Sequence, residues 1–116
     1  FYPFAFSGIC TGELCELRDN LEEFEAAGVT LLGISCDSVF AQKAWTAQEG
    51  FEIDLLSDFR PHGDVARAYG VLDEDNGLAL RGSFLLDADG IVRWSVVNPR
   101  GQRRDLDGYR RALEQL

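Results

Sequence analysis

Residues 29–36 (VTLLGISC) form a near-continuous apolar run in the first third of the chain. A run of this length without polar alternation is typical of a strand that is covered on both faces, as in a parallel sheet. Segments with helical periodicity lie before and after the run, and helices of this kind can supply the cover. The run therefore predicts an α/β fold.

The other segments along the chain support this fold class. Apolar residues recur at spacings of three and four over residues 8–27, which predicts one helix. These residues are Leu14, Leu17, Leu21 and Phe24. The further predicted elements are a helix at 37–49, a strand at 53–56, a short helix at 63–69, a hairpin of 83–87 and 91–97, and a helix from residue 105 with a stripe of Leu106, Tyr109, Leu113 and Leu116. The alternation predicts one domain over residues 1–116, with a mixed central sheet layered by helices.

The charge balance limits the partners of this chain. Its 116 residues include 11 Lys and Arg against 20 Asp and Glu, which gives a formal net charge of −9. Nucleic acid and anionic membrane surfaces would repel such a chain on average, so we expect neither as its main partner. No apolar run approaches the ~20 residues that span a bilayer. We therefore expect no membrane partner. We also expect a cytoplasmic location.

The chain has three cysteines, Cys10, Cys15 and Cys36. An odd number in a chain without a dense cysteine framework argues against a secreted disulfide scaffold. There is no Cys-x-x-Cys pair, and His62 is the single histidine, so a zinc site or another metal site is not expected. The cysteines are predicted to be free thiols that are structural, reactive or both.

Cys10 falls in the first turn of the first predicted helix. Unpaired backbone N–H groups and the positive end of the helix dipole favour a thiolate there. Pro3 and Ser7 precede it in the pattern Pro-x-x-x-Ser-x-x-Cys, after Phe1 and Tyr2, which are predicted to be the tail of a strand. Pro3 can shield the sulfur, and Ser7 offers a hydroxyl about one turn before it. Taken alone, Cys10 would be a buried small residue and Ser7 a helix cap, but the combination indicates a reactive thiol.

This pattern resembles the signature of the peroxiredoxins, Pro-x-x-x-Thr/Ser-x-x-Cys. Segments similar to that family occur along nearly the whole chain, at residues 32–35, 55–58, 68–71 and 81–87. Residues 5–10 and 81–84 are most similar to the alkyl hydroperoxide reductase E-like branch. The resemblance implies a thioredoxin-like fold, in which further strands precede the helix that carries Cys10. Since the chain also lacks methionine, we expect that an N-terminal portion of about 35 residues is absent, judged by usual domain sizes.

The resemblance also implies the roles of the site residues. Cys10 would be the peroxidatic cysteine, and Ser7 stands where threonine is commoner. Arg81, at the start of a late strand, would stabilise the thiolate and the charge on the peroxide oxygens, whereas its spacing alone would make it a solvated arginine. The implied reaction is attack of the thiolate on a peroxide oxygen, which leaves a sulfenic acid and needs no metal, haem or flavin cofactor.

The implied partners are a peroxide, a thiol reductant such as thioredoxin or a glutaredoxin-like protein, and a second copy of the chain in a homodimer. Two alternatives share the fold. A disulfide oxidoreductase usually carries Cys-x-x-Cys, which this chain lacks. A non-enzymatic interaction module would be expected to have lost one of the four motif residues, yet all four positions are filled.

Cys15 is the candidate resolving cysteine. The pattern Cys-Thr-x-Glu-x-Cys at residues 10–15 resembles the Q-type (bacterioferritin comigratory) peroxiredoxins, in which the second cysteine resolves the sulfenic acid. The alkyl hydroperoxide reductase E branch more often uses an external thiol. Five residues of ideal helix separate two Cα atoms by ~8.6 Å, but a disulfide needs about 7 Å or less, so the first turns must unwind. Gly8 and Gly12 lower the cost of unwinding.

The roles of Cys36 and Glu13 are open, and the other polar and aromatic residues considered are predicted to be structural. Cys36 ends a strand on the side of the sheet where the site is expected, but it is predicted to be a buried small residue. Glu13 is either part of a network with Arg81 or a first-turn acid favoured by the helix dipole. His62 is predicted on the surface, and Trp45 and Trp94 are predicted to be packing residues.

Overall fold

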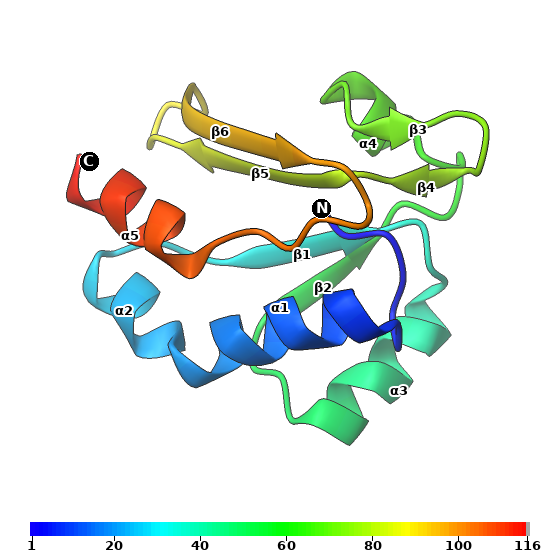
Figure 1. Ribbon diagram of the computed structural model, residues 1–116, viewed down its shortest axis with the longest axis horizontal. Helices are drawn as coiled ribbons and strands as arrows, with labels where there is room; N and C mark the ends of the chain where they lie inside the picture. Colours follow the sequence, from blue (N-terminus) through cyan, green and yellow to red (C-terminus); the bar gives the residue numbers. More distant parts are fainter. Residues whose placement is uncertain (116) are drawn as a thin grey trace.

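The computed structural model describes residues 1–115 (Figure 1). Its elements are α1 (Gly8–Asp19), α2 (Leu21–Ala26), β1 (Leu32–Ser35), α3 (Val39–Glu49), β2 (Asp54–Ser57), α4 (Asp64–Ala68), β3 (Leu72–Asp73), β4 (Leu78–Ala79), β5 (Arg81–Leu86), β6 (Val92–Asn98) and α5 (Leu106–Glu114). The predicted order of long helices and strands is confirmed. The two-residue strands β3 and β4 were not predicted, because neither is long enough to show a period.

The strands form three pairs. The apolar run at residues 29–36 contains β1, which pairs in parallel with β2, as its composition predicted. The other pairs, β3 with β4 and β5 with β6, are antiparallel. Parallel and antiparallel pairing therefore both occur, but within residues 1–115 the pairs are separate and do not form one continuous sheet.

The first two residues lie between β1 and β5 (Figure 1). The Tyr2 amide donates to the Ile34 carbonyl at 3.0 Å, and the Phe1 amine donates to the Gly82 carbonyl at 2.6 Å. These contacts place Phe1 and Tyr2 where a strand between the two pairs would lie, in agreement with their predicted place at the end of a strand. They also bring the segment that leads to Cys10 close to both strand pairs.

An apolar cavity of about 650 Å³ separates β1 from β5 farther along the strands. It is lined by residues 31–34 and 83–86, and by Phe24, Trp94 and Tyr109 among others. Cys10 does not line this cavity. The cavity is therefore distinct from the thiol.

The helix predicted over residues 8–27 is divided into α1 and α2 at Asn20. Asn20 has φ −121° and ψ 18°, outside the helical range. Its side-chain amide donates to the Glu16 carbonyl at 2.8 Å. An asparagine side chain competes in this way with the helical backbone pattern, which accounts for the break.

The ends of the later helices follow local chemistry. The Ser38 hydroxyl accepts from the Ala41 amide at 3.2 Å at the start of α3, and Gly50 ends that helix with φ 67°. The Asp105 carboxylate caps α5 by accepting from the Asp107 amide. In the predicted stripe of α5, Leu106 is buried, Tyr109 and Leu113 are half-buried, and Leu116 lies outside the described residues. None of the helices within residues 1–115 is long and apolar enough to cross a membrane.

Candidate active site

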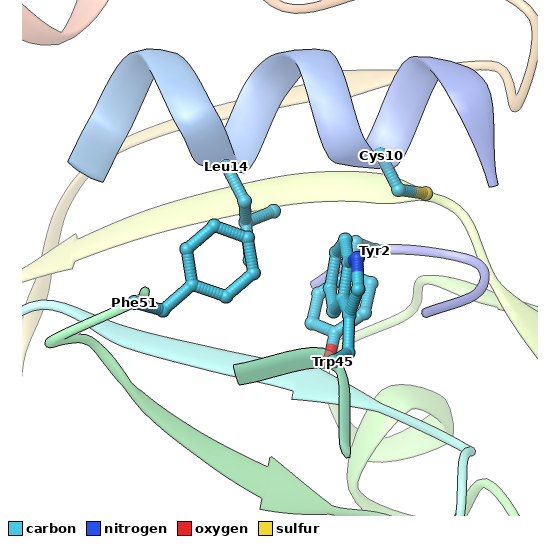
Figure 2. Packing of buried hydrophobic residues seen from close by; sticks show 5 residues of the cluster. All are labelled: Tyr2, Cys10, Leu14, Trp45 and Phe51. Carbon is cyan, nitrogen blue, oxygen red and sulfur yellow. The ribbon is translucent and has the colours of Figure 1, made fainter. Parts of the chain in front are cut away.

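Cys10 is the third residue of α1 and is fully buried. It belongs to a core cluster with Tyr2, Leu14, Trp45 and Phe51. Figure 2 shows Cys10 and Leu14 on the side of α1 that faces the aromatic rings of the cluster, with Cys10 above Trp45 and Tyr2. The predicted position at the N-terminal end of a helix is therefore combined with an apolar floor, which shields the sulfur from water.

Arg81, the first residue of β5, reaches Cys10 from the other side. Its Nη1 lies 3.2 Å from the Cys10 Sγ, and only 3% of the residue is exposed. Its Nε donates to the Arg100 carbonyl at 2.6 Å, which fixes the plane of the guanidinium. The structure thus brings together two residues that are 71 positions apart, as the resemblance to the peroxiredoxins implied. The contact places the positive charge of a guanidinium beside the sulfur.

Glu13 joins Arg81 to a second buried arginine. Glu13 Oε1 accepts from Arg81 Nη1 at 2.6 Å and from Arg104 Nη2 at 3.0 Å. Glu13 Oε2 accepts from the Arg104 amide at 2.8 Å and from Arg104 Nε at 2.9 Å. Of the two interpretations of Glu13, the network with Arg81 is the one that the structure shows.

Burial by itself would raise the pKa of the Glu13 carboxyl, but the hydrogen bonds and charge of Arg104, with the charge of Arg81, outweigh it and lower that pKa below 4.5. Burial alone would lower the pKa of Arg104, and the hydrogen bond to Glu13 instead raises it. The Glu13 carboxylate and the Arg104 guanidinium are therefore ionised in the folded protein. Glu13 balances part of the positive charge beside Cys10 and holds Arg81 in place.

Arg104 was not predicted from the sequence. It also donates from Nη1 to the Gly82 carbonyl at 2.9 Å and to the Ser83 hydroxyl at 3.0 Å. Its neighbour Arg103 is exposed and pairs with Glu16 instead. No spacing or composition signal separates these two adjacent arginines, because the difference depends on how the segment after β6 crosses α1.

The loop before Cys10 carries the other two motif residues. Pro3 is buried, and Ser7 is the residue before α1. The Ser7 hydroxyl donates to the Phe4 carbonyl at 2.9 Å and makes no cap hydrogen bond to the helix. Phe4 and Phe6, in the same loop, are about half exposed at 48% and 49%.

Cys15 is half-buried and packs against the same core cluster as Cys10. Its thiol donates to Glu49 Oε2 at 3.5 Å. Burial, followed by this hydrogen bond to a carboxylate, raises the pKa of the Cys15 thiol above 9.0. Cys15 is thus a neutral thiol near the site but not in contact with Cys10.

The remaining candidates take no part in the network of Arg81, Glu13 and Arg104. Cys36 is buried, and its burial together with the charges of Asp58 and Asp37 raises the pKa of its thiol. His62 is exposed and contacts the Gly77 carbonyl at 2.5 Å. Trp45 is a packing residue of the core cluster beneath Cys10. Within residues 1–115, no group of three or more His, Cys, Asp or Glu side chains could hold a metal ion.

Comparisons with known proteins agree with this geometry. Residues 1–95 match the model of the AhpC/TSA family. The chain is 47% identical over 116 residues to alkyl hydroperoxide reductase E of Mycobacterium tuberculosis, and the match covers 100% of this chain and 76% of that protein. It is 36% identical over 123 residues to the chloroplastic 2-Cys peroxiredoxin BAS1 of Hordeum vulgare, of which it covers 58%.

Solved structures show the same fold. The crystal structure of Enterococcus faecalis AhpC superposes with a TM-score of 0.91 at 33% identity, over 99% of this chain and 70% of that one. The reduced 2-Cys peroxiredoxin of Plasmodium vivax superposes with a TM-score of 0.87 at 33% identity, over 98% of this chain and 61% of that one. The predicted thioredoxin-like fold is therefore confirmed, and the chain spans only part of each relative. The chain belongs to the AhpC/TSA family of peroxiredoxins, which are thiol-dependent peroxidases.

Proposed function

We propose that this chain reduces hydrogen peroxide and organic hydroperoxides with Cys10 as the peroxidatic residue. The observation that carries the proposal is the 3.2 Å contact between Arg81 Nη1 and Cys10 Sγ at the N-terminal end of a helix. Both features stabilise a thiolate, which is the nucleophilic form of cysteine. The exposed Phe4 and Phe6 rings give the approach an apolar border that suits organic hydroperoxides as well as the small peroxide.

In the first step the Cys10 thiolate attacks one peroxide oxygen. The O–O bond breaks and an S–O bond forms, while the peroxide proton passes to the other oxygen, which leaves as water or an alcohol. The sulfenate left on Cys10 takes up one proton from solvent to become the sulfenic acid. The Arg81 guanidinium stabilises the negative charge that develops on the leaving oxygen. The Ser7 oxygen, whose hydrogen is directed to the Phe4 carbonyl, is free to accept from a peroxide O–H.

We propose that Cys15 resolves the sulfenic acid. Its thiol attacks the Cys10 sulfur, a disulfide forms, and the sulfenic oxygen leaves as water. Two observations support this step: both cysteines pack on one cluster, and the first turn of α1 contains Gly8 and has no side-chain cap, so it can unwind at low cost. A dithiol reductant such as thioredoxin or a glutaredoxin-like protein then restores both thiols.

The peroxidase step is tested on the fully reduced protein by following thiol loss after hydrogen peroxide is added. We expect the wild type to react much faster than free cysteine, and Cys10→Ser to abolish the fast phase. Cys36→Ser is the matched control, because Cys36 is also buried but does not contact Arg81. Equal rates for wild type and Cys10→Ser would refute the assignment of Cys10.

The resolving step is tested by intact-mass and peptide analysis after one equivalent of peroxide. A Cys10–Cys15 link in the wild type is the expected product, and Cys15→Ser should instead accumulate a sulfenic acid on Cys10. A stable sulfenic acid in the wild type would contradict the two-cysteine cycle and favour an external thiol.

Assembly and location are proposed on separate grounds. We propose a homodimer, because α3 leaves Val39 and Phe40 exposed at 58% and 81%, and large apolar side chains of this kind commonly mark interfaces. Light scattering tests this, and a mass of one chain at micromolar concentration would contradict it. A cytoplasmic location is proposed because free thiols persist in reducing compartments, and cell fractionation tests it.

A further inference from the structure

The loop of residues 3–6 has a single hydrogen bond to another element among the described residues. The Ala5 amide donates to Asp37 Oδ2 at 2.8 Å, across 32 positions of sequence. Asp37 lies two residues after the end of β1, so this contact ties the loop before Cys10 to the end of the parallel strand pair. Asp37 is absent from the motif residues that the sequence pointed to.

The Asp37 carboxylate is itself held in place by buried groups. The Ser35 hydroxyl donates to Asp37 Oδ2 at 2.7 Å, and Ser35 Oγ in turn accepts from Gln42 Nε2 at 2.9 Å. The same Gln42 nitrogen donates to the Leu56 carbonyl at 2.7 Å. Ser35 and Gln42 are only 1% and 3% exposed. The acceptor for Ala5 is therefore anchored to both β2 and α3.

The loop needs such an anchor because its backbone is strained. Phe6 has φ 67° and is the one residue other than glycine with a positive φ in the part of the chain that the structure describes. A bulky L-residue is disfavoured in this conformation and keeps it only where its surroundings hold it. Two contacts do so here: the Asp37 bond at the preceding residue, and the Phe6 ring, whose centroid is 6.2 Å from that of Trp45.

We infer that Asp37 is a positioning residue for the peroxidatic site. It holds residues 3–6 in the strained form that presents Ser7 and the first turn of α1 to the peroxide. The inference rests on the proposed function for its kinetic consequence, while the position of the loop itself is measurable without any peroxide.

The kinetic test compares Asp37→Ala with two other variants in the Cys10 oxidation assay. Asp37→Ala leaves the Ala5 amide without its acceptor, and misplacement of the reacting groups should slow Cys10 oxidation on the order of 10- to 100-fold. Asp37→Asn keeps an oxygen that can accept from Ala5, so we expect a loss below about threefold. Ser38→Ala is the matched control, because it removes the cap of α3 next to Asp37 without touching the loop, and its rate should equal that of the wild type.

A double variant tests whether Asp37 acts by holding the strain at Phe6. Phe6→Gly removes both the cost of the positive φ and the ring contact with Trp45, whereas Phe6→Ala removes the ring contact but keeps the strain, so the two backgrounds together isolate the strain. We expect the loss caused by Asp37→Ala to be at least about threefold smaller in the Phe6→Gly background than in the Phe6→Ala background. A purely structural role of Asp37 would give the same fractional loss in both backgrounds, and that result would overturn the inference.

Hydrogen exchange of the segment at residues 3–7 provides the readout that does not depend on the reaction. We expect exchange to become about tenfold faster in Asp37→Ala, and to be unchanged in Ser38→Ala and nearly so in Asp37→Asn. Unchanged exchange in Asp37→Ala, or a Cys10 oxidation rate within about twofold of the wild type, would overturn the inference. If Asp37→Ala does not fold, the Asp37→Asn variant decides the question. Cys10 oxidation that is tenfold slower in Asp37→Asn, or exchange of residues 3–7 that is tenfold faster, would overturn the acceptor role. A wild type that reacts no faster than Cys10→Ser would instead refute the proposed function, and the exchange result would still decide the role of Asp37.

Discussion

Glu13→Gln is the substitution that probes the buried network most directly. In the wild type the Glu13 carboxylate accepts four hydrogen bonds, one from Arg81 and three from Arg104. Glutamine has the same shape but replaces one acceptor oxygen with an NH₂ group. Because every partner is a donor, that NH₂ would face a donor whichever way the amide is turned. The substitution therefore removes the charge and at least one hydrogen bond without removing side-chain volume.

The expected loss of stability follows from burial. Arg81 and Arg104 are 3% and 7% exposed, and Glu13 is their one carboxylate partner among residues 1–115. Removing one partner of a buried ion pair costs about 3–5 kcal/mol, because the remaining charge is left uncompensated. Since a domain is stable by only about 5–15 kcal/mol, Glu13→Gln should lose roughly a fifth or more of the free energy of unfolding.

Urea unfolding followed by circular dichroism measures this loss, with Glu23→Gln as the control. Glu23 also receives two hydrogen bonds from one arginine, at 2.8 Å and 2.9 Å from Arg110, but both side chains are 42% exposed. Solvent screens an exposed pair, so Glu23→Gln should be close to the wild type. Equal losses for the two variants would show that burial of the Glu13 network does not determine its contribution, and would refute the reasoning.

The pH dependence of the free energy of unfolding provides a second test of the Glu13→Gln variant. The folded pKa of Glu13 lies below the ordinary carboxyl value of 4.5. The stabilisation is therefore fully present above pH 4.5 and is lost as the pH falls through the lower folded value. The difference in stability between wild type and Glu13→Gln should shrink in that acidic range. A difference that stays constant down to complete acid unfolding would contradict a charge-based contribution.

Three further substitutions have definite outcomes. Burial raises the pKa of Tyr2 to about 12 from 10.0, so its stabilisation is present below pH 10 and is lost as the pH rises through 12. Tyr2→Phe should flatten that alkaline loss in a pH series of unfolding curves. The buried hydroxyl makes no hydrogen bond to any described residue, so the variant should be near wild type at pH 7. Gly33→Ala would place a Cβ 2.7 Å from Leu55 Cδ2, and thermal unfolding should show a loss of about 1–3 kcal/mol. Tyr109→Phe removes a 2.8 Å hydrogen bond to Ser83 and should cost about 1 kcal/mol in urea unfolding; no change would mean that water replaces it.

The elements that could be predicted from the sequence are those specified by neighbouring residues. Ser38 and Gly50 define α3 through a hydroxyl cap and a positive φ, and both act within one helical turn. The turn of the β5–β6 hairpin has the same local origin, with Gly90 at φ 80°. The break at Asn20 was missed, because the apolar spacing continues across it and only the asparagine side chain interrupts the helix.

The site residues also differ in whether neighbouring residues in the sequence specify them. Pro3, Ser7 and Cys10 lie within one loop and one helical turn, so their spacing alone indicated a reactive thiol. Arg81 could be placed only through the resemblance to a family, since nothing local to β5 points toward a cysteine 71 positions earlier. Arg104 and Asp37 had neither kind of signal.

The long-range residues also explain when a reactive Cys10 can exist. Helix α1 alone supplies the helix dipole, but the charge beside the sulfur comes from Arg81 in β5, and Arg81 is oriented by Glu13 and the Arg100 carbonyl. Glu13 is in turn held by Arg104, which follows β6 and donates back to the Gly82 carbonyl of β5. These contacts form only when the β5–β6 hairpin and the segment after it have docked on α1. The buried ion network therefore links the chemistry at the first turn of α1 to complete folding of the second half of the chain, so that a variant weakened in this network should lose thiol reactivity together with stability.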